Sequence, residues 1–173
     1  MDGQVYRAIM RHQAGAVAVI AVGTPGARTG LTATAVCSLS DAPPTILACV
    51  NRTASAHDVI RGIGSFSVNL LAHDQQDVAA RFAGRTGLKG EERFQADEWT
   101  SLVTGAPVLA KALATLDCRL SEEHSFSTHS IFIGRVVEGT VRASAKPLLY
   151  FRGDYWDLIG GADGQPARTI ERG

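Results

Sequence analysis

Short apolar runs alternate with clusters of turn residues along the first fifty positions of the chain. Apolar residues at helical spacing predict one short helix over Val5 to Met10, which Asp2 caps and Gly15 ends. The β-branched run from Ala16 to Val22 predicts a strand, and the glycine–proline cluster at 23–26 predicts a turn after it. The chain therefore begins with a helix followed by strands joined through turns.

The same reading places strands and short helices in the rest of the chain. Ser55 is predicted to cap a helix that runs to Ile60, and Asp74 a helix that carries Phe82 on its apolar face. The stretch from 84 to 102 is predicted as loop with a short helix. A turn-rich link is predicted at 38–44. The remaining predicted strands are 29–37, 45–51, 65–71, 112–120, 130–141 and 148–151.

Six or seven short strands with helices inserted irregularly favour an antiparallel barrel over a doubly wound sheet. The doubly wound alternative would be supported by a glycine-rich dinucleotide or phosphate-binding loop. Neither G-x-G-x-x-G nor G-x-x-x-x-G-K-[ST] occurs in the sequence. We therefore expect a mainly β protein without a Rossmann cofactor site.

Composition and charge narrow the class of protein. The 173 residues are 45% hydrophobic, and 17 basic residues balance 17 acidic ones without long runs of either sign. An ordered globular chain is expected, and nucleic acid is not an expected partner. No signal peptide is recognisable, and no apolar run approaches the roughly 20 residues that span a bilayer. These features predict a cytoplasmic location without a membrane span.

Cysteine and histidine do not suggest a metal site. The three cysteines, Cys37, Cys49 and Cys118, lie far apart in apolar stretches and are expected to be buried thiols. Four of the five histidines lack the spacing of metal ligands, and most of them are expected to be exposed. These four are His12, His57, His73 and His124.

Small residues dominate the strand that begins at Thr29. Gly30, Ala33, Thr34 and Ala35 would let the backbone approach a flat ligand, whose polar edge its N–H groups could then bind. A threonine-rich edge strand with ordinary packing explains the same residues equally well. The sequence leaves both interpretations open.

Two other segments offer candidate ligand contacts. Asn51-Arg52-Thr53-x-Ser55 lies between a strand and a helix start, where N–H groups and a guanidinium can hold a phosphate, although a simple Ser55 cap is the alternative. Tyr150, Tyr155 and their aromatic neighbours could line a planar ligand, close a dimer interface or pack in the core.

Several segments, in order along the chain, resemble the flavin reductase-like family. The first is T-G-L-T-A-T-A-V-C-S-L-S at 29–40, followed by P-P at 43–44 and L-A-C-V-N-R-T-A-S-A-H at 47–57. Further matching segments lie at 66–70, 80–84, 93–94, 99, 105–109, 131–136 and 147–153. The similarity extends over roughly residues 5 to 158.

The resemblance implies a fold and an assembly. We expect an FMN-binding split β-barrel, antiparallel and Greek-key-like with a few short helices, that forms a homodimer with flavin near the subunit interface. This domain would occupy residues 1–158, and residues 159–173 are expected to form a mobile tail. The implied flavin is FMN, with FAD as an alternative, and the implied co-substrate is NADH or NADPH.

The resemblance also implies site residues. His129 would face the flavin and the nicotinamide, although Ser127-Thr128 stands where family members usually carry Gly-Asp. The implied flavin contacts are Thr32, Ala33, Thr34, Ser38, Leu39, Cys49, Val50, Asn51, Ser55, Phe82 and Tyr155.

The implied activity is hydride transfer from the nicotinamide cofactor to flavin, for which the flavin itself supplies the chemistry. In one alternative, reduced flavin leaves for a partner aromatic monooxygenase of the 4-hydroxyphenylacetate type. In a second, bound flavin reduces a cobalt corrinoid, cob(II)yrinic acid a,c-diamide. A third, of another class, is a split barrel that binds flavin or heme without turnover.

Overall fold

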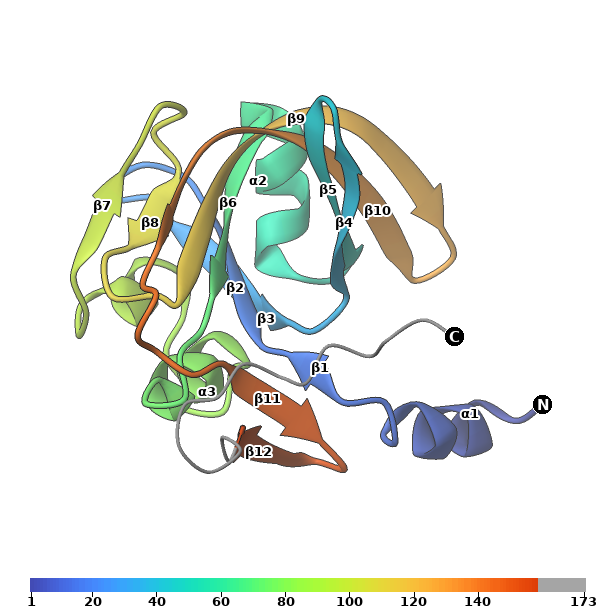
Figure 1. The fold of residues 1–173 in the computed structure, drawn as a ribbon. Helices are drawn as coiled ribbons and strands as arrows, with labels where there is room; N and C mark the ends of the chain where they lie inside the picture. Colours follow the sequence, from blue (N-terminus) through green and yellow to red (C-terminus); the bar gives the residue numbers. More distant parts are fainter. Residues whose placement is uncertain (159–173) are drawn as a thin grey trace, which may run out of the picture.

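The computed structural model describes residues 1–158, and the predicted tail at 159–173 lies outside the described residues. Twelve strands and four short helices make up this part of the chain (Figure 1). The helices are α1 (Gly3–Met10), α2 (Ser55–Ile63), α3 (Gln76–Phe82) and the 3₁₀ helix η1 (Gly90–Phe94). The strands are β1 (Gly15–Ala16), β2 (Ala18–Val22), β3 (Thr29–Ala33), β4 (Val36–Asp41), β5 (Pro44–Asn51), β6 (Ser65–Leu70), β7 (Trp99–Ser101), β8 (Pro107–Leu109), β9 (Ala114–Phe126), β10 (His129–Val141), β11 (Leu148–Phe151) and β12 (Asp154–Asp157).

Seven of these strands form one antiparallel sheet in the order β3-β2-β6-β9-β10-β5-β4. The two edge strands, β3 and β4, are consecutive in the chain and are joined only by Thr34 and Ala35. Six strand spacings would separate the edges of a flat sheet by about 29 Å. The link between Ala33 and Val36 spans at most about 11 Å, so the sheet must curl until its edges meet. The predicted antiparallel barrel with a few short helices is confirmed.

The barrel core contains side chains from β2, β5, β6 and β10 together with those of α2. In Figure 1, α2 lies between β6 and β5, and its Ala56 and Ile60 are fully buried against the strands. Gly134 of β10 makes room for this core, because a Cβ atom there would lie 2.6 Å from Phe66 Cζ. The barrel interior is thus packed with side chains, and any ligand must bind at its rim or outside.

A second core lies on the outer face of β2. Val17, Val19 and Ala21 pack against α3, η1, β8 and β11, while the alternate residues of β2 face the barrel core. This arrangement explains the continuous apolar run at 16–22, because a strand covered on both faces needs apolar residues at every position.

Two smaller sheets and α1 lie around the barrel. The order β1-β11-β12 forms one sheet, β7-β8 forms the other, and α1 projects from the lower right of the body in Figure 1. Asp2 caps α1 as predicted, with its carboxylate accepting from the N–H of Gln4. None of the helices within residues 1–158 is long and apolar enough to cross a membrane.

The strand predicted at 29–37 is two strands. β3 pairs with β2 at one edge of the sheet, whereas β4 pairs with β5 at the other, so the chain must leave one edge and join the other at Thr34–Ala35. The predicted link at 38–44 is also wrong, because β4 continues to Asp41 and β5 starts at Pro44. Five more strands are present than the highest number predicted, and most of them are short strands that pair with a neighbour in sequence, such as β7 with β8 and β11 with β12.

Several predicted helix boundaries are also corrected. Helix α1 ends at Met10, and Gly15 instead begins β1. Ala54, not Ser55, is the N-cap of α2, and Ser55 Oγ lies 2.8 Å from Thr29 Oγ1. Asp74 does not cap α3, because Gln75 holds that position. The Asp74 carboxylate instead accepts a hydrogen bond of 3.2 Å from Arg142.

The three cysteines differ in burial, contrary to the expectation that all are buried. Cys118 is buried, Cys49 is half-buried, and Cys37 is exposed on edge strand β4. Burial raises the pKa of the Cys118 thiol to about 12, with a further contribution from Asp117. Cys37 is exposed because its side chain points outward, whereas the preceding Val36 of β4 packs against the barrel core.

Candidate functional site

The corner between β3 and β4 breaks the regular hydrogen bonding of the barrel. Ala33 is the last residue of β3 paired with β2, and the carbonyl of Ala35 accepts a bond of 2.9 Å from the N–H of Cys49 on β5. Thr34 lies outside both strands and is exposed, and its N–H has no backbone partner within residues 1–158. A backbone donor is therefore available at this corner.

A pocket of about 200 Å³ opens at this corner, and we refer to it as the seam pocket. Its residues come from β3 and its corner, from the turn after α3, and from the β11–β12 hairpin. They are Val17, Thr32, Ala33, Thr34, Ala83, Arg85, Tyr150 and Tyr155. Together with Val17, which lies between β1 and β2, these segments meet around one cavity.

Side-chain contacts hold β3 against α3 and η1. Thr32 Oγ1 donates to the carbonyl of Ala79 in α3 at 2.7 Å, so this hydroxyl is used within the fold. On the same strand, a Cβ at Gly30 would lie 2.7 Å from the carbonyl of Ile20 and 3.0 Å from Phe82. The guanidinium of Arg93 in η1 donates to the Gly30 carbonyl at 3.0 Å. These contacts fix the strand whose end lines the pocket.

Aromatic side chains form the opposite wall. The rings of Tyr150 and Tyr155 meet edge to face with their centroids 5.6 Å apart, and the guanidinium carbon of Arg85 lies 5.5 Å from the Tyr155 centroid. Burial raises the pKa of the Tyr155 hydroxyl, against the opposing effect of Arg85. The hydroxyl is therefore protonated at neutral pH and can donate a hydrogen bond.

A second cavity, which we call the hairpin pocket, measures about 490 Å³. It lies between the start of α2 and the β9–β10 hairpin and is lined by Asn51, Arg52, Thr53, His57, Asp58, Arg61, Ser127 and Thr128. Asn51 Oδ1 accepts hydrogen bonds of 2.9 Å from the N–H and the hydroxyl of Thr53. The Asn51 side chain thus stabilises the turn that it belongs to. The Arg52 guanidinium donates to the Ser127 carbonyl at 3.2 Å.

His129 is exposed at the first position of β10, directly opposite Asn51 on β5. Its Nδ1 atom lies 2.9 Å from Thr128 Oγ1. The Thr128 hydroxyl thus partners this imidazole, and Nε2 of His129 makes no hydrogen bond within residues 1–158. Asn51 is two residues beyond Cys49, which bonds the β3–β4 corner, and His129 is on the opposite side of β5 from that corner. His129 is therefore offset from the corner by about 7 Å along the strands and by two strand spacings, about 10 Å, across the sheet.

The structure brings together only part of the predicted flavin contacts. Thr32, Ala33, Thr34 and Tyr155 line the seam pocket. Asn51 lines the hairpin pocket, and Ser55 bonds Thr29 at the far end of β3, about 10 Å from Thr32. Their role as flavin contacts stays a prediction.

The other predicted contacts lie away from the two pockets. Cys49 is half-buried on β5 next to Ile131, whereas Ser38 and Leu39 are exposed on β4. Val50 and Phe82 are buried in the two cores, so neither side chain is open to a ligand in this chain. The assignment of these residues to flavin stays a prediction.

One buried histidine was not predicted from the sequence. His57 is 2% exposed, contrary to the expectation for most of the histidines, and its Nε2 lies 2.8 Å from Ser130 Oγ. Its Nδ1 lies 2.9 Å from Asp58, and this hydrogen bond is the main reason that the pKa of Asp58 is lowered. The signal was the position of His57 between Ala56 and Ile60, on the side of α2 that faces the barrel.

Arg85 was also missed. It follows the segment A-R-F-A-G in a stretch predicted as loop, and nothing local places it opposite Tyr155. The contact exists because the β11–β12 hairpin packs beside the turn after α3.

Comparison with known proteins shows which protein family this chain matches. Residues 10–158 match the family model described as flavin reductase like domain. The chain is 40% identical over 174 residues to FMN reductase (NADH) RutF 1 of Methylorubrum extorquens strain PA1, an alignment that covers 98% of this chain and 85% of that protein.

Solved structures agree with this match. BorF, the flavin reductase component of a bacterial two-component tryptophan halogenase, superposes with a TM-score of 0.83 at 34% identity over 91% of this chain and 98% of its own. The NADH:FAD oxidoreductase SgcE6 of Streptomyces globisporus C-1027, in complex with NAD and FAD fragments, superposes with a TM-score of 0.84 at 28% identity over 93% and 96%.

Proposed function

Because the chain belongs to the flavin reductase-like domain family, we propose that it is an NADH-dependent FMN reductase whose reduced flavin serves a partner monooxygenase component. FMN and NADH are the ligands in the name of the RutF relative. The oxidised nicotinamide and the reduced flavin are the two products. FAD and NADPH are the alternatives that the binding experiment below compares.

The seam pocket is the observation that carries this proposal. Four of the residues that the family resemblance assigns to flavin, Thr32, Ala33, Thr34 and Tyr155, line it. A flat heteroaromatic ring fits here because the β3 backbone is open, the N–H of Thr34 can donate to the ring edge, and tyrosine rings form a wall.

When bound, the flavin supplies the hydride-accepting chemistry. The role of the chain is then to hold two rings in register and keep water from them. Thr34 would orient one ring through its N–H, Tyr155 would cover it, and Nε2 of His129 would donate to the nicotinamide or to developing charge. The Thr128 hydroxyl on Nδ1 orients the imidazole for that contact.

The seam pocket in one chain is smaller than the roughly 300–1,000 Å³ typical of sites that enclose a ligand. A second copy of the chain that covers its open side would complete the site. This supports the expectation of a homodimer with flavin near the subunit interface.

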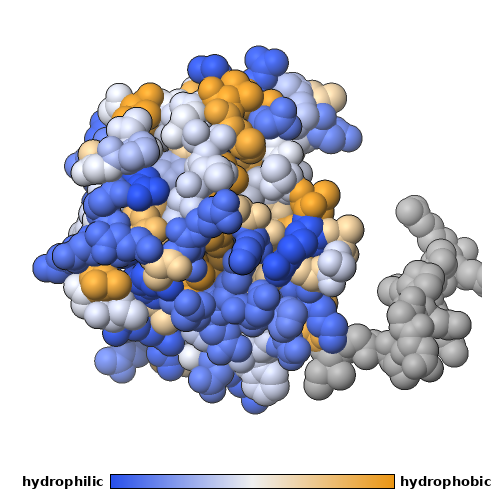
Figure 2. Space-filling view, turned by 90° about the vertical axis from the view of Figure 1, so that its left-hand side faces the viewer, coloured by the Kyte–Doolittle hydropathy of each residue, from blue (hydrophilic) through white to orange (hydrophobic). Residues whose placement is uncertain are grey.

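The face for that second copy is the outer surface of β4, β5 and β10. Leu47 faces outward between Cys37 and Ile133, and Cys49 faces outward beside Ile131. This apolar row ends at His129 and Asn51, so a copy docked on it would reach the candidate site. On the opposite side of the molecule, over β7 and β8, Figure 2 shows hydrophobic residues only in small patches among hydrophilic ones.

The proposal also covers the electron acceptor, a monooxygenase component that receives the reduced flavin. Thr34 and Ser55 are exposed, and the seam pocket is open in one chain, which suits a flavin that binds and leaves. BorF is the reductase component of a two-component system, and we carry that relationship to this chain as part of the proposal.

The test is anaerobic reduction of flavin by the purified protein. We expect NADH to bleach the visible bands of added FMN, with faster turnover for FMN than for FAD and for NADH than for NADPH. A Soret band in place of flavin bands, or no NADH oxidation with either flavin, would contradict the assignment as a reductase.

The acceptor is tested in the same assay. Excess free FMN should sustain NADH oxidation, and a monooxygenase component separated by a dialysis membrane should still receive reduced flavin. Turnover only when a cob(II)alamin-type corrinoid is added, with flavin retained by the protein, would overturn the monooxygenase proposal and favour the corrinoid acceptor.

A further inference from the structure

Arg85 lies in a rigid turn at the wall of the seam pocket. The turn follows α3 directly, Gly84 adopts a left-handed φ of 77°, and the N–H of Arg85 donates to the carbonyl of Ala80 at 3.0 Å. The backbone of this residue is thus anchored to a helix, and its side chain reaches across to the Tyr155 ring at 5.5 Å.

The charge of Arg85 is not balanced by an acid at the pocket. Arg85 is the only charged residue among those that line the seam pocket, and it forms no ion pair within residues 1–158. In contrast, Arg28, Arg61, Arg81 and Arg142 each pair with a carboxylate. The seam pocket is therefore a cavity with a net positive charge.

The remaining polar groups at this wall are donors or neutral. The hydroxyls of Tyr150 and Tyr155 can donate, and the Tyr155 ring attracts the exposed guanidinium of Arg85, whose central carbon lies 5.5 Å from the ring centroid. A guanidinium held in one orientation offers two parallel N–H groups, the geometry that phosphate oxygens accept.

We propose that Arg85 is a specificity-determining residue that binds a phosphate group of one of the two nucleotides used by the enzyme. This inference rests on the proposed function for the identity of those nucleotides. At neutral pH the oxidised flavin ring and the nicotinamide carry no negative charge, so the phosphate of FMN and the pyrophosphate of NADH are the anions that match the uncompensated cation.

These two sources make different predictions, because each nucleotide has a counterpart that lacks phosphate. Riboflavin is FMN without its phosphate, and dihydronicotinamide riboside is the corresponding counterpart of NADH. An interaction with phosphate distinguishes the members of one pair, whereas an interaction with a ring affects both members equally.

The experiment compares the wild-type protein with Arg85→Gln and Arg85→Lys. Equilibrium dissociation constants for FMN and riboflavin are measured by fluorescence quenching, and half-saturating concentrations of NADH and dihydronicotinamide riboside are measured by anaerobic flavin bleaching. Arg152→Gln is the matched control. Arg152 lies on the β11–β12 hairpin that also carries Tyr155, and its guanidinium carbon is 5.1 Å from the centroid of the Phe151 ring, but it lines neither the seam pocket nor the hairpin pocket.

For Arg85→Gln we expect a loss of about 10- to 100-fold in the affinity for one phosphate-bearing nucleotide, with its phosphate-free counterpart unchanged. Arg85→Lys should retain part of that affinity, because it keeps the charge but not the paired donors. A selective loss for FMN identifies the flavin phosphate, and a selective loss for NADH identifies the pyrophosphate.

Equal changes for both members of a pair, or no change in either pair, would overturn the proposal. The same losses in Arg152→Gln would also overturn it, because they would show a general effect of surface charge. The flavin-binding arm needs no turnover, so it judges Arg85 even if the wild-type protein fails to oxidise NADH and the proposed function is wrong.

Discussion

Ser130 Oγ lies 2.8 Å from Nε2 of His57, and both residues are almost completely buried. Ser130 also lies 3.0 Å from Ser125 Oγ and donates to Glu123 at 3.1 Å, and Glu123 accepts from Arg61 at 2.8 Å. This network joins α2 to both strands of the β9–β10 hairpin. It therefore fixes the end of the hairpin next to the turn, where Thr128 and His129 lie.

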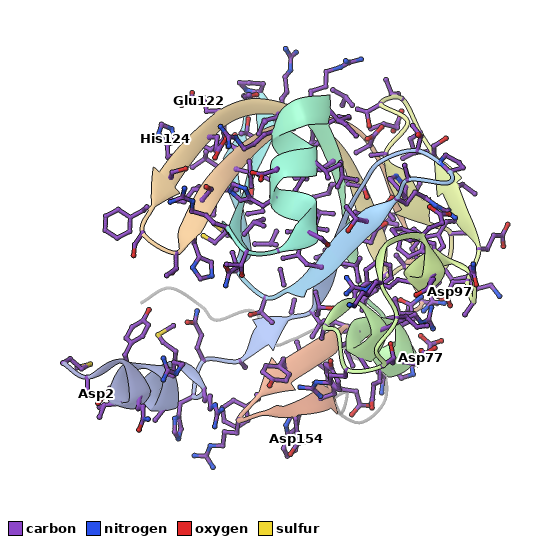
Figure 3. All side chains as sticks on the ribbon, turned by 180° about the vertical axis from the view of Figure 1, so that it is seen from behind. Asp2, Asp77, Asp97, Glu122, His124 and Asp154 are labelled. Carbon is purple, nitrogen blue, oxygen red and sulfur yellow. The ribbon has the colours of Figure 1, made fainter. Side chains whose placement is uncertain are left out.

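Removing the imidazole should destabilise the fold. In His57→Ala, the buried Ser130 hydroxyl loses a partner and a cavity is left beside Phe132, whose ring centroid lies 5.2 Å away. We expect the free energy of unfolding to fall by about 1–3 kcal/mol, measured by urea denaturation. His124→Ala is the control, because Figure 3 shows His124 and Glu122 on the outer face of β9, and it should change stability by less than about 0.5 kcal/mol.

His129 should affect hydride transfer rather than folding. His129→Ala removes an exposed side chain, so the urea midpoint should stay within the range of the His124→Ala control, whereas the rate of FMN bleaching by NADH should drop by about tenfold or more. Thr128→Val should give a smaller drop, because it removes only the hydroxyl at Nδ1. A bleaching rate equal to that of the wild type would refute the role of His129.

The outer face of β5 tests the proposed dimer. Leu47→Glu places a charge in the apolar row between Cys37 and Ile133, and we expect a folded monomer by sedimentation with weaker FMN binding. Val103→Glu is the control, because Val103 is also exposed but lies outside this row. An unchanged mass for Leu47→Glu would show that the dimer, if one forms, uses another face.

A methyl group at Gly134 should not fit the barrel. The Cβ of Gly134→Ala would lie 2.6 Å from Phe66 Cζ and 3.0 Å from Cys118 Cβ, so the core must shift, at a cost of about 1–3 kcal/mol. Gly62→Ala in α2 meets no atom within 4 Å and should instead stabilise the protein by about 0.4–1 kcal/mol. Both the unfolding temperature and the urea midpoint should therefore fall for Gly134→Ala and rise for Gly62→Ala.

The ion pair between Arg28 and Glu91 should make stability depend on pH. Hydrogen bonds from the Arg28 side chain hold the pKa of Glu91 below its ordinary value of 4.5. The stabilisation is therefore fully present above about pH 4.5 and is lost as the pH falls through the lower, folded-state pKa. Glu91→Gln should be less stable than the wild type at pH 7, and the difference should shrink below pH 4.5. A difference that stays constant with pH would contradict the assignment.

Local patterns predicted most of the elements and the barrel class. The apolar run at 16–22, the Asp2 cap and the strands near 45–51, 65–71 and 148–151 all agree with the structure within a few residues. They could be predicted because each depends on which faces of a short segment are buried. The strand at 29–37 was wrong because its break is set by two different partners, β2 and β5, rather than by its own composition.

The candidate site was predictable only where its residues belong to the strands of the barrel rim. Ala33 and Thr34 were suggested by their small side chains, and the family resemblance supplied Thr32, Tyr155 and His129. Arg85 and His57 were missed. The roles of these two residues depend on contacts across 70 and 73 positions of sequence, with Tyr155 and Ser130 respectively.

The sequence by itself thus determined a mainly β antiparallel chain, an apolar strand at 16–22, and a run of small residues that could be either a ligand-binding strand or an ordinary edge strand. Only the tertiary structure decided that this run ends at the point where the barrel closes, that its pocket carries one unbalanced arginine, and that a histidine is buried beneath the hairpin. The physical reason is that burial periodicity is a property of neighbouring residues. Pocket walls and buried polar networks instead depend on which distant strands and turns pack together.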